Sequence, residues 1–386
     1  MRVGVNYTPR RGWFHSWLDL DEREVAADFK TLAALGLDHV RIFPLWPLLQ
    51  PSRTMVNQRA VDDVVRVVQL AQDNGLQVSV DVLNGHLSSF DFVPSWVTSW
   101  HQRNLFADPE VVQAQALLVG ELAGALSHEP GATGVCLGNE FAQFAAPRHP
   151  QQSRISERQA ADWLRTLLAA ARRAWPEGDH VHSFDDDIWF VDEHPFTPQH
   201  AVELGDLTTV HSWVFVAAGP RFGAGHPALP AFARYLCDLA NAWAPEPGRR
   251  LWLQELGAPI THVPAGQAAR FLADTMVALL GTPNLEAVTW WCSHDVDRSL
   301  GDFPELEYSL GLVDSEGRVK PAGHQLAELV PEMQISPASE PVGGPVVDFV
   351  GDPARRSLTS STGAVFDEWL ALHLAGERPV LRRVAG

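Results

Sequence analysis

The chain has 386 residues, of which 46% are hydrophobic and 20% are charged, a composition typical of a folded globular protein. Its formal net charge of −18 argues against nucleic acid as a partner, because phosphate binding requires a basic surface. The N-terminus lacks a signal-peptide pattern, and no apolar run is long enough to cross a membrane, so we expect a cytoplasmic protein with no membrane contact. The three cysteines lie far apart in the sequence, so we expect them to be reduced thiols.

Strand-like and helix-like segments alternate along the chain in eight consecutive pairs. The predicted strands cover residues 2–7, 39–46, 77–83, 134–140, 180–186, 207–215, 250–257 and 286–294. The predicted helices cover residues 22–35, 59–74, 109–127, 156–175, 198–204, 228–243, 265–280 and 321–330. Ser156 and Gln159 have the spacing of a capping box at the start of the fourth helix.

Eight such pairs predict an α/β fold, the (β/α)8 TIM barrel. A doubly wound open sheet is the alternative, but it needs no eighth unit and usually carries a glycine-rich phosphate turn, which this sequence lacks. From Pro331 the alternation stops in a stretch rich in Pro, Ser and Gly. We therefore expect a catalytic barrel over residues 1–330 and a small C-terminal appendage, packed on the barrel, over residues 331–386.

Three predicted strand-to-helix connections are long, namely residues 84–108, 141–155 and 292–320. All three follow the carboxyl ends of strands, which is the face where barrel enzymes place their sites. Loops of this length would narrow the mouth of the barrel to a pocket. A pocket favours action on a terminal sugar over cleavage inside a polymer.

Two of the predicted strands each deliver one glutamate to their carboxyl end: Glu140, after Gly138 and Asn139, and Glu255. These strands lie roughly across the barrel from each other. Carboxyl groups about 5 Å apart suit retaining glycoside hydrolysis, and a gap of about 6.5–9.5 Å suits inversion. A lone strand-end glutamate is usually a solvated carboxylate, but the pair predicts Glu140 as the acid, Glu255 as the nucleophile and Asn139 as a ligand of a sugar hydroxyl.

This pattern resembles glycoside hydrolase clan A, and most of all family 5, over about residues 2–330. Further matches at the expected strand ends are Arg41, His86, His211 and Trp291. The resemblance implies that these four residues belong to the sugar site, with Arg41 beside the nucleophile and Trp291 under the sugar ring. The structural alternatives are a salt-bridge role for Arg41 with Asp38 or Asp81 and core packing for the histidines.

The sequence departs from the family at residues 211–213, where His-Ser-Trp replaces the usual His-x-Tyr. Trp213 can donate a hydrogen bond to the nucleophile through its indole N–H, but it has no phenol. The N-terminal stretch Val3–Asp19 is similar to a branch of family 5 linked to exo-acting β-mannosidases on mannose–N-acetylglucosamine units. We therefore expect a retaining, exo-acting β-mannosidase; an endo-β-mannanase or a β-glucosidase is the alternative within the clan.

Two hypotheses of other classes stay open at this point. A carbohydrate-binding barrel without turnover is favoured by the change from Tyr to Trp213. A metal-dependent barrel enzyme could use the histidines and Asp185–Asp187, but the HExxH spacing is absent. We expect no metal and no cofactor, and we expect one of Asp185–Asp187 to bind a sugar hydroxyl; Asp295 and Asp297 raise the same question. The sequence does not determine the oligomeric state.

Overall fold

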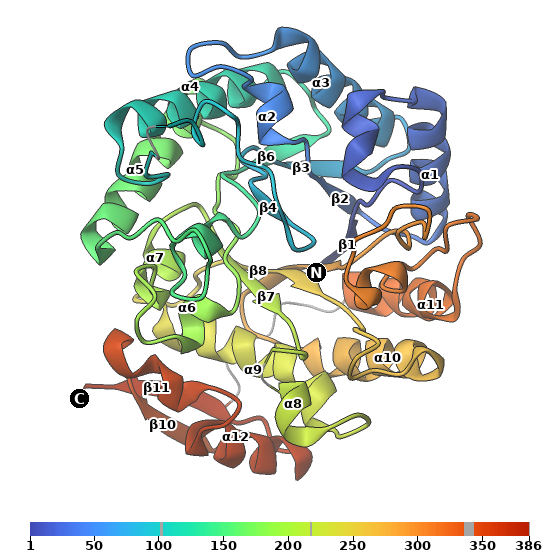
Figure 1. Cartoon of the computed structure of the whole chain (residues 1–386). Helices are drawn as coiled ribbons and strands as arrows, with labels where there is room; N and C mark the ends of the chain where they lie inside the picture. Colours follow the sequence, from blue (N-terminus) through green and yellow to red (C-terminus); the bar gives the residue numbers. More distant parts are fainter. Residues whose placement is uncertain (101–102, 217, 336–342, 386) are drawn as a thin grey trace.

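The computed structural model describes residues 1–386 apart from 101–102, 217, 336–342 and 386. Within the described residues, parallel strands form one curled sheet in the order β6–β3–β2–β1–β9–β8–β7, and helices surround it (Figure 1). The strands are β1 (Arg2–Asn6), β2 (His39–Ile42), β3 (Gln77–Asp81), β6 (Ala132–Cys136), β7 (Thr208–Ser212), β8 (Leu251–Leu256) and β9 (Leu285–Trp290). The predicted (β/α)8 barrel is confirmed.

The predicted fifth strand, residues 180–186, lies between β6 and β7 but is not a regular strand. Its start pairs with β6 through bonds from Asp179 N to Thr133 O (2.9 Å) and from Val181 N to Val135 O (3.1 Å). On the other side, the Thr209 hydroxyl of β7 donates to the carbonyl of His182 at 2.6 Å. Between this segment and β7, a side-chain hydrogen bond therefore takes the place of part of the backbone pairing that was expected to close the barrel.

The helices begin and end within one or two residues of most predicted bounds, because their apolar spacing and caps are local signals. The main ones are α1 (Glu22–Ala34), α3 (Gln58–Gln72), α4 (Pro109–Leu126), α5 (Glu157–Ala174), α7 (Pro198–Glu203), α9 (Ala228–Trp243), α10 (Ala268–Leu279) and α11 (Pro321–Ile335). The shorter ones are α2 (Trp46–Leu49), α6 (Asp187–Phe190) and α8 (Ala218–Phe222), with 3-10 turns η1 (Trp13–Leu18), η2 (Phe141–Ala145), η3 (Ala265–Gln267) and η4 (Glu305–Tyr308). Ser156 and Gln159 form the expected capping box at α5.

Burial follows the layers of the barrel. Helix α3 buries Val61, Val64 and Val68, which lie three and four residues apart and so share one face of the helix. Strands β2, β7 and β8 are buried along their whole length, because inward side chains fill the barrel and outward ones meet the helices. The polar residues at the carboxyl ends of these strands therefore stand over a packed interior.

Helix α11 continues through Pro331 to Ile335, so the helix is longer than the predicted 321–330. The core of the predicted linker, residues 336–342, lies outside the described residues. Beyond it, β10 (Val346–Val350) and β11 (Val380–Val384) form a two-stranded parallel sheet with η5 (Pro353–Thr359) and α12 (Ala364–Leu374), next to α9 (Figure 1). The division of the chain into a barrel and an extension at residue 330 stays a prediction.

The three cysteines, Cys136, Cys237 and Cys292, are buried free thiols. None of the three is in a disulfide, and all three side chains pack in the interior. Every helix among the described residues is too short or too polar to pass through a lipid bilayer. The cytoplasmic location stays a prediction.

Arg356 of η5 ties the C-terminal extension to the barrel. Its side chain is 1% exposed and donates to the carbonyls of Val191, Asp192, His194 and Phe196, which follow the short helix α6. The carbonyls of His194 and Phe196 are buried and receive a donor from the guanidinium in place of water, whereas that of Val191 also accepts from the backbone N–H of His194. The extension thereby holds the segment next to the carboxyl end of the fifth strand position.

Replacing Arg356 with Ala leaves the buried carbonyls of His194 and Phe196 without this donor. We expect the free energy of unfolding to fall by about 3 kcal/mol. Urea denaturation of the variant and the parent measures this difference. The neighbouring Arg355 is exposed, so Arg355→Ala is the matched control and should stay within about 0.5 kcal/mol of the parent. Equal stability of the two variants would contradict the tethering role.

Candidate active site

A pocket of about 410 Å³ opens at the carboxyl ends of the barrel strands. This volume falls in the usual range of small-molecule sites. The described residues that line it come from five strand-to-helix connections and one barrel strand, β8. They are His86, Ser88, Ser89, Asp91, Asn139, Glu140, Gln143, Arg148, His149, Pro150, Asp185, Asp186, Trp213, Phe215, Val216, Glu255, Trp291, Leu306 and Glu307.

The chain reaches Glu140 through a tight passage beyond β6. A side chain at Gly138 would meet the carbonyl oxygen of Leu83 at 2.3 Å, so only glycine fits beside the neighbouring strand end. Glu140 itself has a positive φ of 41°, which is rare for a residue with a side chain. Gln143, one turn later in η2, donates from Nε2 to Glu140 Oε2 at 2.7 Å. A strained backbone thus turns the Glu140 carboxyl group into the pocket.

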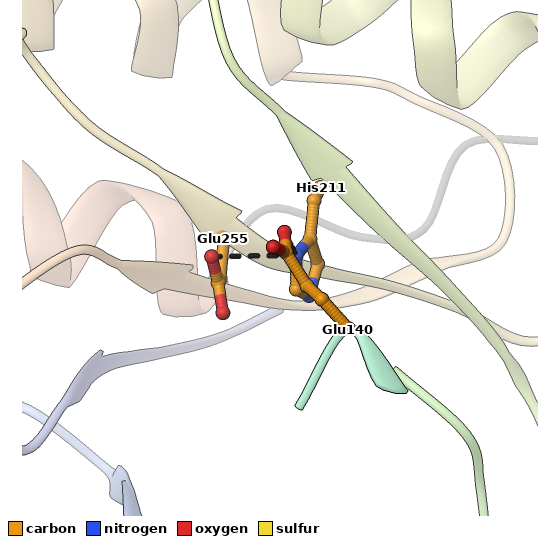
Figure 2. Close-up of side chains that lie close together, drawn as sticks. All are labelled: Glu140, His211 and Glu255. Carbon is orange, nitrogen blue, oxygen red and sulfur yellow. Dashed lines mark hydrogen bonds and ion pairs between the residues drawn. The ribbon is translucent and has the colours of Figure 1, made fainter. Parts of the chain in front are cut away.

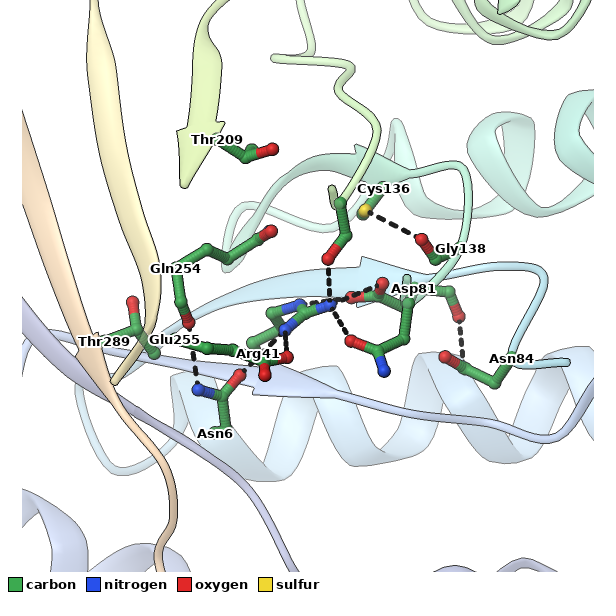
Figure 3. Close-up of polar contacts among 12 residues, drawn as sticks. Asn6, Arg41, Asp81, Asn84, Cys136, Gly138, Thr209, Gln254, Glu255 and Thr289 are labelled. Carbon is green, nitrogen blue, oxygen red and sulfur yellow. Dashed lines mark hydrogen bonds and ion pairs between the residues drawn. The ribbon is translucent and has the colours of Figure 1, made fainter. Parts of the chain in front are cut away.

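Arg41, at the end of β2, is fully buried and connects strand ends around the barrel (Figure 3). It donates to both oxygens of Asp81, at 2.6 and 2.9 Å, and to Glu255 Oε1 at 2.7 Å. Further bonds reach Asn6, Asn139 and Ser183 at 2.7–3.1 Å. The sequence left two alternatives for Arg41, a structural salt bridge or a place beside Glu255. The structure shows both, because Arg41 pairs with Asp81 and contacts Glu255.

Glu140, His211 and Glu255 meet at the centre of the pocket floor (Figure 2). His211 Nδ1 lies 2.7 Å from Glu140 Oε1 and 3.3 Å from Glu255 Oε2. One ligand atom of each of the three residues lies within 4.8 Å of the other two. Trp213 donates from its indole nitrogen to Glu255 Oε2 at 3.2 Å, in the place where the family has its tyrosine. The two carboxyl groups thus face each other with one imidazole between them.

Burial and the neighbouring charges move the pKa values of the two glutamates in opposite directions. Burial raises the pKa of Glu140, but the hydrogen bond and electrostatic attraction from His211 outweigh it, so the net shift is downward. Burial raises the pKa of Glu255 and repulsion from Glu140 adds to this effect, against His211 and Arg41. Two carboxylates this close compete for one proton, and without a sugar Glu255 holds it more readily than Glu140.

The same three residues have the donor types of a metal site, because two carboxylates and an imidazole can bind a divalent ion. The electrostatics argue against this use. The Arg41 guanidinium lies 2.7 Å from Glu255 Oε1, and a dication there would be repelled by it. His211 Nδ1 also already faces Glu140 at hydrogen-bond distance. The arrangement suits proton transfer and nucleophilic attack better than cation binding.

The other predicted sugar ligands lie around this centre. Trp291 is 3% exposed and lines the pocket, whereas the adjacent Trp290 packs in the barrel core. Asn139 accepts from Arg41 and donates from Nδ2 to the carbonyl of His86 at 3.2 Å. His86 begins the hairpin of β4 (His86–Leu87) and β5 (Phe90–Asp91), and its Nδ1 lies 2.9 Å from Asp91 Oδ1. All the predicted site residues that were matched to strand ends therefore reach one pocket or the network beneath it.

The acidic residues left open by the sequence separate into two groups. Asp185 and Asp186 line the pocket, and burial raises the pKa of both carboxyl groups well above the ordinary range. Asp187 pairs with Arg148 at 3.0 Å. Asp295 instead bonds to Lys320 and Asp297 caps a turn at Ser299, away from the pocket-lining set. Only the first group can contact a pocket ligand.

Several residues of the pocket and of the network beneath it escaped the sequence analysis. Asn6, a buried partner of Arg41, ends the first strand, so the strand-end pattern could have found it. Gln143 lies one 3-10 turn after Glu140, but the turn itself had no sequence signal. Ser88 and Glu307 sit in long connections without periodicity, and only the fold brings them to the pocket.

No protein-family model matches the sequence, and no curated protein matches it either. Solved structures do match. A GH5_18 protein from Streptomyces cattleya, with a glutamate replaced by alanine and in complex with Manβ1-4GlcNAc, is 48% identical with a TM-score of 0.97, covering 99% of this chain and 94% of that chain. A GH5_18 protein from Bifidobacterium longum subsp. longum, in the same kind of complex, is 42% identical with a TM-score of 0.96, covering 99% of this chain and 91% of that chain.

A more distant structure is the exo-β-1,4-mannosidase Op5Man5 from Opitutaceae bacterium strain TAV5. It is 23% identical with a TM-score of 0.84, covers 99% of this chain and 69% of that chain, and supports the fold alone. The two GH5_18 structures each cover 99% of this chain, whose barrel carries a pair of strand-end glutamates. The protein is therefore a glycoside hydrolase of clan A. More narrowly, the chain belongs to family 5, in the group GH5_18. The predicted family is confirmed.

Glu307 offers a test of the electrostatics of the pocket. Burial raises the pKa of Glu307 from 4.5 to about 7, so its contribution to stability is complete below pH 4.5 and is lost as the pH rises through about 7. Glu307→Gln removes this effect. We expect the free energy of unfolding to fall less between pH 4.5 and pH 8 in the variant than in the parent, by roughly 2–3 kcal/mol.

Urea unfolding at the two pH values measures the difference. Glu305→Gln is the matched control, because exposed Glu305 lies in the same turn and its pKa is lowered by Arg298, below this window. Parallel pH dependence in the parent and Glu307→Gln would count against a buried, proton-holding Glu307.

Proposed function

We propose that this glycoside hydrolase is a retaining β-glycosidase that removes a terminal β-linked mannose, as from mannose β-linked to N-acetylglucosamine. The observation that carries the proposal is the pair of buried glutamates whose nearest ligand atoms lie within 4.8 Å across the pocket. This separation leaves no room for a water molecule between a carboxylate and the sugar, as inversion would require. It suits direct attack by one glutamate.

Glu255 is the nucleophile in this proposal and Glu140 is the acid and base. Glu255 attacks the anomeric carbon while the bond to the leaving oxygen breaks, and Glu140 gives its proton to that oxygen. Water then attacks the same carbon, gives a proton to Glu140, and releases Glu255. Arg41 and Trp213 hold one Glu255 oxygen each, which fixes the attacking group.

The pKa order without a sugar runs against these roles, so the assignment rests on position. Glu255 is 3% exposed and held by two donors, whereas the Glu140 side chain is 11% exposed beside Gln143. The more exposed glutamate suits exchange of protons with a leaving group and with water. A leaving oxygen that accepts a hydrogen bond from Glu140 stabilises its protonated form, so sugar binding moves the proton from Glu255 to Glu140.

Mannose is favoured by the solved relatives. Two GH5_18 structures, 48% and 42% identical to this chain, hold Manβ1-4GlcNAc, and a third holds GlcNAc. In the proposed complex Trp291 stacks under the mannose ring, Asn139 binds its 2-hydroxyl group, and Arg41 acts by positioning both Glu255 and Asn139. His86 lies within reach of a hydroxyl group from the hairpin.

Variants of the two glutamates with azide test both roles. Glu255→Ala should lower kcat for 4-nitrophenyl β-mannoside at least about 10³-fold, because the covalent step is lost. In Glu140→Ala, azide should restore turnover and give the β-mannosyl azide, since it attacks the covalent intermediate. In Glu255→Ala, azide should replace the nucleophile and give the α-mannosyl azide.

Nuclear magnetic resonance of the products distinguishes the two azides, and Glu305→Ala serves as an exposed control that should keep parental turnover. Turnover of Glu255→Ala within tenfold of the parent would overturn the nucleophile assignment. Sugar binding without turnover by the parent would instead favour the non-catalytic barrel.

The exo reading predicts the order of products from a longer chain. A β-1,4-mannotriose labelled at its reducing end should release single unlabelled mannose units first, leaving labelled mannobiose and then labelled mannose. Time-resolved chromatography measures this order. Early appearance of unlabelled mannobiose would mean that the bond next to the labelled mannose is cleaved first. The site would then accept two mannose units on the non-reducing side of the cleaved bond, as an endo-β-mannanase does.

A further inference from the structure

Three loop segments pack against one another beside the pocket, and two of them line it. They are η1, the β4–β5 hairpin and the η4 loop, and Figure 1 shows the hairpin reaching over the middle of the barrel. Phe14 of η1 lies 4.6 Å from Phe92 and 5.5 Å from Phe303, and Phe90 lies 4.8 Å from Phe303, between ring centroids. Because aromatic rings from all three segments interdigitate, they form a firm wall beside the pocket.

Glu307 projects from this wall into the pocket. The residue is 7% exposed, and its Oε2 is buried with no hydrogen-bond partner among the described residues. The indole N–H of Trp291 and the Ser88 hydroxyl group lie close enough to Glu307 to lower its pKa against the effect of burial, but neither forms a hydrogen bond with Oε2. A buried carboxyl oxygen without a partner is costly unless a ligand binds it.

The hairpin supplies hydroxyl groups next to Glu307. Ser88 and Ser89 form its two-residue turn with φ values of 50° and 68°, a conformation for which Asn-Gly is the usual sequence. The indole nitrogen of Trp13 donates to Ser88 Oγ at 3.2 Å and so orients it. Both serines line the pocket. Strained polar residues at this position suggest a binding role for the turn.

Electrostatic contacts distinguish the surroundings of the two glutamates. Glu255 acts on Glu307 more strongly than Glu140 does, whereas Arg148, whose side chain is 52% exposed, pairs with Asp185 and Asp187 and acts on Glu140. A leaving group protonated by Glu140 therefore extends toward Arg148. The ring of the cleaved sugar then extends the other way from the anomeric carbon, so its C3 and C4 edge meets Glu307.

We propose that Glu307 recognises the terminal sugar by binding its 3- and 4-hydroxyl groups, and that the wall behind Glu307 excludes a further sugar on that side. This inference rests on the proposed function, because it takes its direction from the roles of Glu140 and Glu255. It assigns the exo specificity to a residue outside the barrel strands. With a pKa raised by burial to about 7, the Glu307 carboxyl group can accept from one hydroxyl and donate to another.

The test pairs variants with altered sugars. The parent, Glu307→Gln, Glu307→Ala and the exposed control Glu305→Gln are assayed on 4-nitrophenyl β-mannoside and on its 3-deoxy and 4-deoxy analogues. We expect Glu307→Ala to lower kcat/KM on the intact mannoside about 100-fold, mostly through KM, and Glu307→Gln to lower it less. On at least one deoxy analogue the parent and Glu307→Ala should differ by less than about fivefold, because the contact is already absent.

Thermal melting of each variant checks that the fold is intact, and the isosteric Glu307→Gln keeps the comparison possible if the alanine variant is unstable. An equal loss by the Glu307 variants on all three sugars, or no loss on the intact one, would overturn the role of Glu307 while leaving the proposed function standing. A parent that hydrolyses no β-mannoside would overturn both. Glu305→Gln should match the parent on every sugar.

Discussion

The structure depends on how the buried guanidinium of Arg41 is neutralised. A charge with no access to water is tolerated only when its donors are all used, and Arg41 uses them on Asp81, Glu255 and amide or hydroxyl oxygens from three other strand ends. These bonds cross the barrel from β2 to β8. The same hydrogen bonds therefore connect the strand ends of the fold and orient the Glu255 carboxyl group. The floor of the pocket is therefore as rigid as the barrel itself.

On this floor, two glutamates share the influence of one histidine. His211 contacts both carboxyl groups, and its shorter contact is with Glu140. The two carboxyl groups therefore compete for one proton, and burial together with repulsion from Glu140 favours it on Glu255. In the proposed mechanism, binding of the leaving group would shift this preference to Glu140, because a hydrogen bond to the leaving oxygen stabilises the protonated form.

The loops decide what the common floor acts on. Part of the pocket lining is Glu307, backed by a cluster of aromatic rings, and another part is formed by Asp185, Asp186 and the exposed Arg148. The C-terminal extension takes part indirectly, since Arg356 fixes the carbonyls that follow α6, next to the acidic residues. A barrel with the same strand ends but other loops would keep the chemistry and change the sugar.

The sequence by itself determined the eight repeats, most helix bounds and the placement of Glu140 and Glu255 at strand ends, because periodicity, capping and turn residues act over a few neighbours. It did not determine the irregular fifth strand position, where a threonine hydroxyl replaces backbone pairing. Nor could it bring Glu307 from an aperiodic loop to the pocket or order the pKa values of the glutamates. Those features depend on distances between segments up to hundreds of residues apart, which only the tertiary structure sets.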